Sequence, residues 1–278
     1  MDKPDPNARR NRNRTSDSIM TKKDNFYIGW QPKMAKETKR VIVIFIVAIA
    51  VIVFTLIFWV VNKQKPFNAH NFEYGKLTTI TGTYYANPAP ILVADAFGFP
   101  VELSKDILLV GYGKFGAEGI LQSAEKAKKL MNGSKVKLQG TLIYGDGRTL
   151  LELTEKEASV IEVYTGEKQE VNNETKRITK HLKGEILDPK CYFGVMKPGE
   201  GKIHKSCAIR CISGGVPPVL RVMSDEGYQY YIMVGGQGQQ MNKEVLPYVA
   251  ETIDVNGKTA EINGWNFIYM DNIEYVKK

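Results

Sequence analysis

The chain has 278 residues, enough for one large domain or two small ones, and its 43% apolar and 24% charged residues exclude a wholly disordered chain or a collagen-like repeat. Three cysteines exclude a disulfide scaffold, although they leave room for one bridge or one site. The net charge of +8 raises nucleic acid or an anionic membrane as a partner, so its distribution along the chain has to be examined first.

Most of the excess charge lies in residues 1–40. This segment has eleven Lys and Arg against five Asp and Glu, a net +6, and it is predicted to be a basic, largely disordered cytoplasmic arm. Contact with anionic lipid or a cytosolic partner is an alternative role. Its aromatic stretch, residues 25–33, is expected to rest on the membrane surface or to dock onto a neighbouring membrane subunit.

Residues 41–61 contain no charge over 21 positions, which at 1.5 Å per residue matches the hydrocarbon core of a bilayer, about 30 Å thick. The segment is too long for the apolar part of a signal peptide, so a transmembrane helix that remains as a signal anchor is predicted. The positive flank places the N-terminus in the cytoplasm and residues 62–278 outside, as in a bacterial inner (cytoplasmic) membrane protein with a periplasmic domain. The outer region carries 27 basic and 25 acidic residues, which argues against nucleic acid as its partner.

Short runs rich in Val, Ile, Thr and Tyr, separated by Gly, Asn and Asp, predict a mainly β outer region. Strands are expected near 76–85, 90–95, 106–112, 135–144 and 149–154, with one helix at 117–131 ended by Asn132-Gly133. The predicted organisation is a first β module over 62–163, a polar linker over 164–181 and a second β module over 182–278.

The second module repeats features of the first in the same order. The matched segments are 77–85 with 181–187, 90–93 with 218–222, 107–113 with 231–237, and 132–144 with 256–269, the last placing Gly140 opposite Gly264. Two related β modules of this size, each with one short helix, predict small barrels of the five-stranded OB type. A β-sandwich remains the alternative, because strand count and spacing do not determine closure.

The modules differ by one insertion, residues 188–217. The passage from Gly184 to Pro218 is about 25 residues longer than the passage from Gly82 to Pro90, and extra loops of this length in compact modules usually have a function. All three cysteines and one of the three histidines lie in this insertion.

The insertion residues Cys191, His204, Cys207 and Cys211 form a candidate metal set. A helix over 203–213 would place His204, Cys207 and Cys211 within about 60° of one another on one face, with Cys191 reaching in from the preceding loop. Thiolates and imidazole suit Zn, Cu(I) or an iron–sulfur cluster, although the spacing lacks the C-x-x-C knuckle typical of structural zinc. Asp188 is a weaker candidate, as an oxygen ligand.

Two other interpretations of the cysteines remain open. Thiols outside the cytoplasm tend to oxidise, so a disulfide from Cys191 to Cys207 or Cys211 would simply fasten the loop to its helix. A catalytic thiol would need His204 as its base, and the sequence shows no third residue that orients this histidine. His70 and His181 stand alone and are predicted to be packing or surface residues.

The leading functional hypothesis is an accessory or assembly subunit of a membrane-associated complex, because the sequence contains no recognisable catalytic constellation and the anchor is retained. The alternative is a metal-binding or redox protein in metal delivery or electron transfer. A thiol-dependent enzyme is the third hypothesis.

Overall fold

The computed structural model of the chain describes residues 34, 36–64, 70–95, 103–168 and 174–270. Most of the predicted basic arm, including the aromatic stretch 25–33, lies outside these residues. The chain divides into an N-terminal unit, residues 1–66, and a larger compact unit, residues 67–278.

The described part of the N-terminal unit is dominated by one helix, α1 (Lys36–Lys63), which is 28 residues long. No residue of α1 is buried by the described part of the chain. Two polar side chains in its C-terminal half bond to the helix backbone: Thr55 Oγ1 donates to Val51 O, and Asn62 Nδ2 donates to Phe58 O. By length and composition, α1 is sufficient to cross a membrane.

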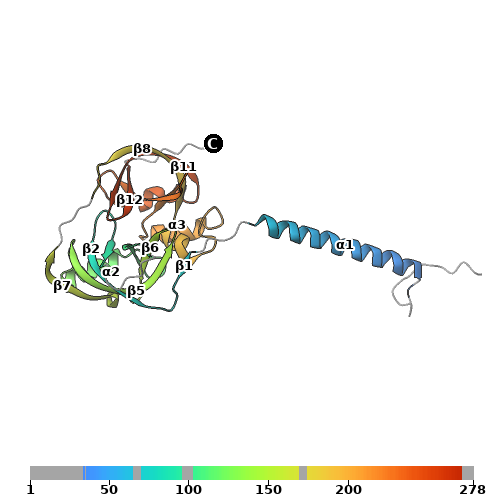
Figure 1. Ribbon diagram of the computed structural model, residues 1–278, viewed down its shortest axis with the longest axis horizontal. Coiled ribbons are helices and arrows are strands. Elements are labelled where there is room, and N and C mark those ends of the chain that lie inside the picture. The colour runs from blue at the N-terminus through green and yellow to red at the C-terminus, as the bar shows by residue number, and fades with distance from the viewer. Residues whose placement is uncertain (1–33, 35, 65–69, 96–102, 169–173, 271–278) are drawn as a thin grey trace, which may run out of the picture. The chain divides into compact units, whose positions relative to one another are not determined.

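The compact unit contains two closed five-stranded barrels (Figure 1). Barrel 1 has the strand order β2-β3-β4-β6-β5, closed by the pairing of β5 with β2. Its strands are β2 (Thr78–Tyr85), β3 (Ile91–Ala94), β4 (Asp106–Gly111), β5 (Ser134–Gly145) and β6 (Arg148–Leu153). Helix α2 (Glu118–Lys128) lies between β4 and β5 in the chain, and β1 (Asn71–Phe72) and β7 (Val160–Lys168) add to β5.

Barrel 2 has the same arrangement, with the strand order β8-β9-β10-β12-β11. Its strands are β8 (Ile178–Leu187), β9 (Val219–Ser224), β10 (Gly227–Gly235), β11 (Thr252–Ile262) and β12 (Trp265–Met270), and the short helix α4 (Asn242–Val245) follows β10. In both barrels the third strand runs parallel to the fifth, whereas the other pairs are antiparallel. Closure excludes the sandwich alternative.

The strand registers of the two barrels correspond residue by residue. Gly82 pairs with Ala94 and Val136, and the equivalent Gly184 pairs with Val222 and Ile253. The third pair of matched segments is 107–113 with 231–237. It is confirmed, because the bridge Val110–Gly116 of barrel 1 has its equivalent in the bridge Val234–Gln240 of barrel 2.

The fourth match of the sequence analysis was out of register. Thr141 pairs with Glu152 and Lys258 with Tyr269, so Gly140 is equivalent to Gly257, and not to Gly264. The two Asn-Gly dipeptides misled the alignment because Asn132-Gly133 precedes strand β5, whereas Asn256-Gly257 lies within β11.

Other element boundaries also differ from the sequence expectation. Helix α2 ends at Lys128, because Lys129 adopts a left-handed conformation (φ 55°) and its N–H bonds to Ala124 O. The predicted linker 164–181 contains strand residues at both ends, since β7 extends to Lys168 and β8 begins at Ile178. A polar segment can form an edge strand when one of its faces is solvated.

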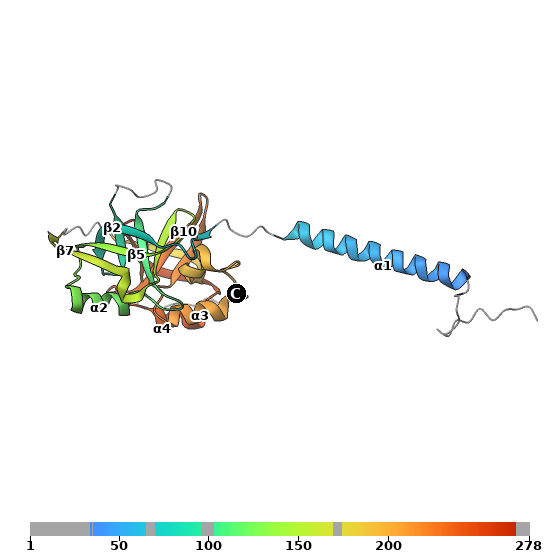
Figure 2. The same ribbon diagram turned by 90° about the horizontal axis from the view of Figure 1, so that it is seen from below.

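The two barrels share a hydrophobic core. One cluster joins Leu108 and Ile143 of barrel 1 to Trp265 and Phe267 of barrel 2, and the insertion residue Phe193 lies in the same cluster. Helix α3 (Lys205–Ser213), the main helix of the insertion, lies near α4 when the unit is seen from below (Figure 2). The insertion is therefore part of the packed unit.

Candidate metal centre

The insertion folds into two short helical pieces. Residues Cys191–Val195 form a single π-helical turn, in which the N–H of Met196 bonds to Cys191 O at 3.0 Å. Helix α3 follows, two residues shorter than the predicted 203–213, with His204 at its N-cap position. Single π-turns frequently mark functional sites, because they redirect side chains.

The four predicted ligands come together in two overlapping groups that share Cys191. The ligand atoms of Cys191, His204 and Cys207 lie within 4.8 Å of one another, and so do those of Asp188, Cys191 and Cys211. A zinc ion about 2.3 Å from sulfur and 2.0 Å from nitrogen keeps its ligand atoms about 3.5 Å apart. Small side-chain movements would therefore close either group around a metal ion.

Two donor atoms in these groups are buried without a hydrogen-bond partner in the described part of the chain. They are Nε2 of His204 and Oδ2 of Asp188. The His204 side chain is only 3% exposed and Asp188 is fully buried. Buried polar atoms usually have a hydrogen-bond partner, so the lack of one at these two atoms indicates that each can bind a ligand.

Burial and mutual contacts set the protonation of the site. Burial lowers the pKa of His204, which keeps the imidazole neutral and available as a ligand at neutral pH. A hydrogen bond with Cys211, and then burial, raises the pKa of Cys191, so this residue is a thiol until a metal ion displaces its proton.

Lys114 contacts the site from barrel 1. Its Nζ donates to Cys207 Sγ at 3.0 Å, and this bond raises the pKa of the lysine. An ammonium group beside a sulfur atom supplies a countercharge for a thiolate. Cys207 is half-buried, so it is the most accessible of the three sulfur atoms.

All three cysteines are free thiols in this structure. Sγ of Cys191 lies 4.0 Å from Sγ of Cys207, about twice the length of a disulfide bond. For the catalytic alternative, Nε2 of His204 has no hydrogen-bond partner among the described residues, so no residue orients the ring through this nitrogen.

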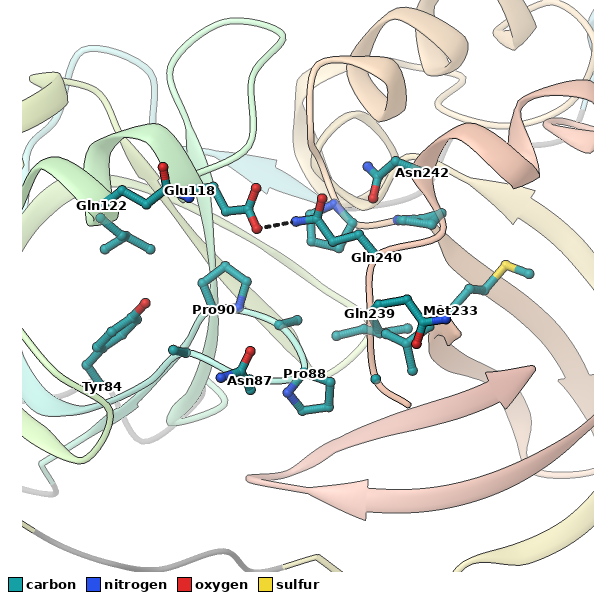
Figure 3. A pocket seen from close by; sticks show the side chains of 18 of the residues that line it. Tyr84, Asn87, Pro88, Pro90, Glu118, Gln122, Met233, Gln239, Gln240 and Asn242 are labelled. Carbon is teal, nitrogen blue, oxygen red and sulfur yellow. Dashed lines mark hydrogen bonds between the residues drawn. The ribbon is translucent and has the colours of Figure 1, made fainter. Parts of the chain in front are cut away.

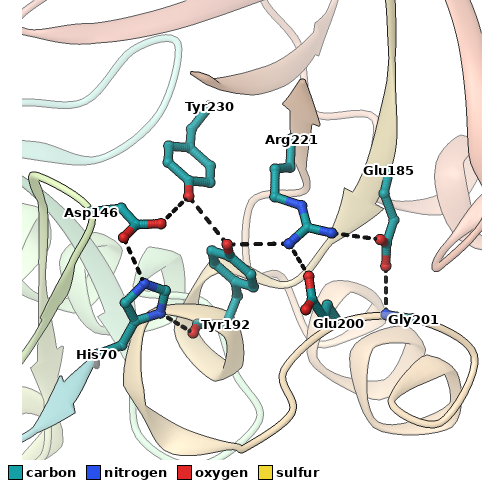
Figure 4. A network of polar contacts seen from close by, with 8 residues as sticks. All are labelled: His70, Asp146, Glu185, Tyr192, Glu200, Gly201, Arg221 and Tyr230. Atoms are coloured by element: carbon teal, nitrogen blue, oxygen red, sulfur yellow. Dashed lines mark hydrogen bonds and ion pairs between the residues drawn. The ribbon is translucent and has the colours of Figure 1, made fainter. Parts of the chain in front are cut away.

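A second polar cluster joins the insertion to both barrels (Figure 4). His70 Nδ1 lies 2.8 Å from Tyr192 O, and Nε2 lies 3.0 Å from Asp146 Oδ1. Tyr230 donates to Asp146 at 2.5 Å and lies 3.2 Å from the Tyr192 hydroxyl.

The other end of this network fixes the insertion loop. Arg221 donates to the Tyr192 hydroxyl at 3.2 Å, to Glu185 at 2.9 Å and to Glu200. Glu185 accepts from the Gly201 N–H at 2.6 Å, so the loop at 199–202 is held against barrel 2.

Sequence reasoning missed two participants of these clusters. His70 is a buried member of the network, whereas the exposed His181 only approaches Asp254, at 3.7 Å. Lys114 lies 93 positions before Cys207, on a loop with no sequence signal that connects it to the cysteines.

Comparisons with protein-family models, with curated proteins and with solved structures found no match for this chain. The functional argument therefore depends on the chemistry of the site.

Proposed function

We propose that this protein is a membrane-anchored metal-binding protein that holds one soft transition-metal ion at Cys191, His204 and Cys207. The observation that carries the proposal is the convergence of two sulfurs and an imidazole nitrogen of His204 within 4.8 Å. Nε2 of the same ring is buried and has no hydrogen-bond partner among the described residues. Thiolates and imidazole favour Cu(I) or Zn(II) over hard cations such as Mg²⁺.

An exchangeable ion fits this site better than a permanent structural one. Structural zinc sites are closed by four protein ligands, whereas this group offers three, and Cys207 remains partly accessible. Cys211 and Asp188 provide further donors, which form a second group with Cys191. A role in metal delivery follows from an accessible soft-metal ligand beside a second set of donors.

In this proposal α1 spans the cytoplasmic (inner) membrane with the basic arm inside, so the barrels and the metal site lie on the outer, periplasmic side. The barrels are two copies of an OB-like module. The equivalent registers of Gly82 and Gly184 support duplication, and the parallel pairing of the third and fifth strands supports the OB-like assignment.

The metal site is tested on the full chain, purified in mild detergent under reducing conditions. Elemental analysis and titration with Zn(II) and Cu(I) should give close to one ion per chain. Cys207→Ser and His204→Ala should each weaken binding by at least about 100-fold, because loss of a ligand exceeds the 10- to 100-fold typical of outer-shell changes. Ser206→Ala, an exposed neighbour on α3, is the matched control.

Mass spectrometry of the protein taken from its membrane under non-reducing conditions is the counter-test. A stoichiometric disulfide from Cys191 to Cys207 or Cys211 would contradict the metal site, because too few thiolates would remain.

A second candidate function, an accessory or assembly subunit of a membrane-associated complex, is favoured by a crevice between the barrels. The crevice has a volume of about 330 Å³ and is lined by residues of both barrels. Photocrosslinking in the native membrane from position 122, on the wall of the crevice, should capture a protein partner. The absence of any crosslinked protein from this position would contradict the docking role.

A further inference from the structure

The crevice lies where equivalent parts of the two barrels meet (Figure 3). Pro90 stands directly before β3 and Pro218 directly before β9, and each accepts an equivalent backbone hydrogen bond at 2.9 Å, from Leu109 N–H and from Met233 N–H. Together with Pro88 and Pro217 these prolines give the crevice an apolar, rigid lining. Proline rings lose little conformational freedom when a ligand packs on them.

One wall of the crevice is acidic. Glu118, Gln122 and Glu125 follow one another at helical spacing along α2, so they share the face that lines the crevice. The described residues that line it include no lysine, arginine or histidine. Gln240 of barrel 2 bridges the gap by donating to Glu118 Oε1 at 2.5 Å (Figure 3).

The pKa of the Tyr84 hydroxyl reflects the negative charge of this wall. Burial raises the pKa of its hydroxyl first, and the charges of Glu125 and Glu118 raise it further. Both carboxylates therefore act on the same buried hydroxyl, although they are about two helical turns apart. A positive group placed near Tyr84 would interact favourably with both.

We infer that the crevice binds a basic side chain, with arginine the better fit, presented by a partner polypeptide. Its guanidinium would pair with Glu118 and Glu125, and its aliphatic stem would lie along Pro88 and Pro218. The primary amides of Asn87 and Gln122, which make no side-chain hydrogen bond within the described residues, match the N–H and C=O groups of a peptide. The inference gives chemistry to the proposed docking role and is independent of the metal site.

The test uses the full chain in detergent and ligand-observed NMR titration with N-acetyl-arginine methylamide. The control probe is N-acetyl-citrulline methylamide, which has nearly the same shape and no charge. The arginine probe should bind at least about tenfold more tightly, as expected for charge-assisted hydrogen bonds. The variant Glu118→Gln/Glu125→Gln should remove this preference, whereas Glu226→Gln, an exposed acid of the β9–β10 turn, should keep it.

Equal binding of the two probes, or an unchanged preference in the double variant, would overturn the inference. Agmatine, an alkylguanidinium without peptide groups, distinguishes the source: tighter binding of agmatine than of the arginine probe would indicate a small-amine site and contradict a polypeptide ligand. Crosslinking from position 122 without arginine preference would leave the docking role intact and reject only the arginine chemistry.

Discussion

Cys191 is the residue common to both donor groups of the insertion. One group adds Cys207 and His204, and the other adds Cys211 and Asp188. The contact with Cys211 is the main cause that raises the pKa of the Cys191 thiol. We therefore expect different roles for Cys207 and Cys211, although each lies two residues from the middle of α3.

The first prediction separates these roles. Cys211→Ser should still bind one metal ion, with an affinity lowered by less than about tenfold, whereas Cys191→Ser should lose more than about 100-fold. The reason is that Cys211 lies outside the group that contains His204 and Cys207. Competition with a colorimetric chelator measures both affinities. Equal losses in the two variants would show that all three sulfurs bind the same ion.

Asp106 gives a second, pH-dependent prediction at the residue scale. Burial raises its pKa above the ordinary value of 3.8, with Arg148 partly opposing the rise. A carboxyl group with a raised pKa in the folded state makes folding less favourable as pH rises through that pKa, because the folded state retains the proton longer. Asp106→Asn should therefore stabilise the protein relative to wild type at pH 7 and not at pH 3. Thermal melts across this range measure the difference, and a constant difference would contradict it.

At the scale of the strands, equivalent glycines allow close approach in each barrel. A Cβ atom at Gly82 would lie 2.3 Å from Val93 O, and one at Gly184 would lie 2.3 Å from Arg221 O. Both contacts are with backbone of the neighbouring strand, which cannot move without breaking the ladder. The glycines are thus required by strand packing in each copy.

We predict that Gly82→Ala and Gly184→Ala each lower the free energy of unfolding by about 1–3 kcal/mol, as for other overpacked sites. Gly119→Ala is the control, because a Cβ there meets no atom within 4 Å and alanine is the better helix former. Urea unfolding of the three variants checks the prediction. A destabilised Gly119→Ala with unaffected strand variants would contradict it.

The sequence predicted the strands of barrel 1 within a few residues because alternating apolar residues and turn residues are local signals. Gly140 was matched with Gly264 instead of Gly257, because an Asn-Gly pair occurs both in a turn and within a strand. Lys114 and His70 were missed because their contacts with the insertion arise only when the two barrels pack together. Cys191, His204, Cys207 and Cys211 could be grouped as a candidate set from the sequence because a single insertion contains them all.

At the scale of the whole molecule, the barrels are joined by a buried ion pair next to the candidate metal site. Nζ of Lys190, in the insertion, lies 2.5 Å from Oε1 of Glu152 in β6, and the two side chains are 3% and 6% exposed. The same ammonium donates to Gly111 O at 2.8 Å and to Gly113 O at 2.6 Å, next to the loop that carries Lys114. The ion pair therefore holds the insertion next to the loop that carries Lys114.

The last prediction concerns this ion pair. Lys190→Met leaves the Glu152 carboxylate buried without its cation, which should lower the free energy of unfolding by about 3–5 kcal/mol. Lys183→Met removes one partner of an exposed ion pair with Asp254 and should cost no more than about 1 kcal/mol. The double variant Lys190→Met/Glu152→Leu should lose less than Lys190→Met alone, because no unpaired charge remains buried. Urea unfolding followed by tryptophan fluorescence gives all three values. A double variant that loses as much as Lys190→Met, or more, would show that the two residues do not act as a pair.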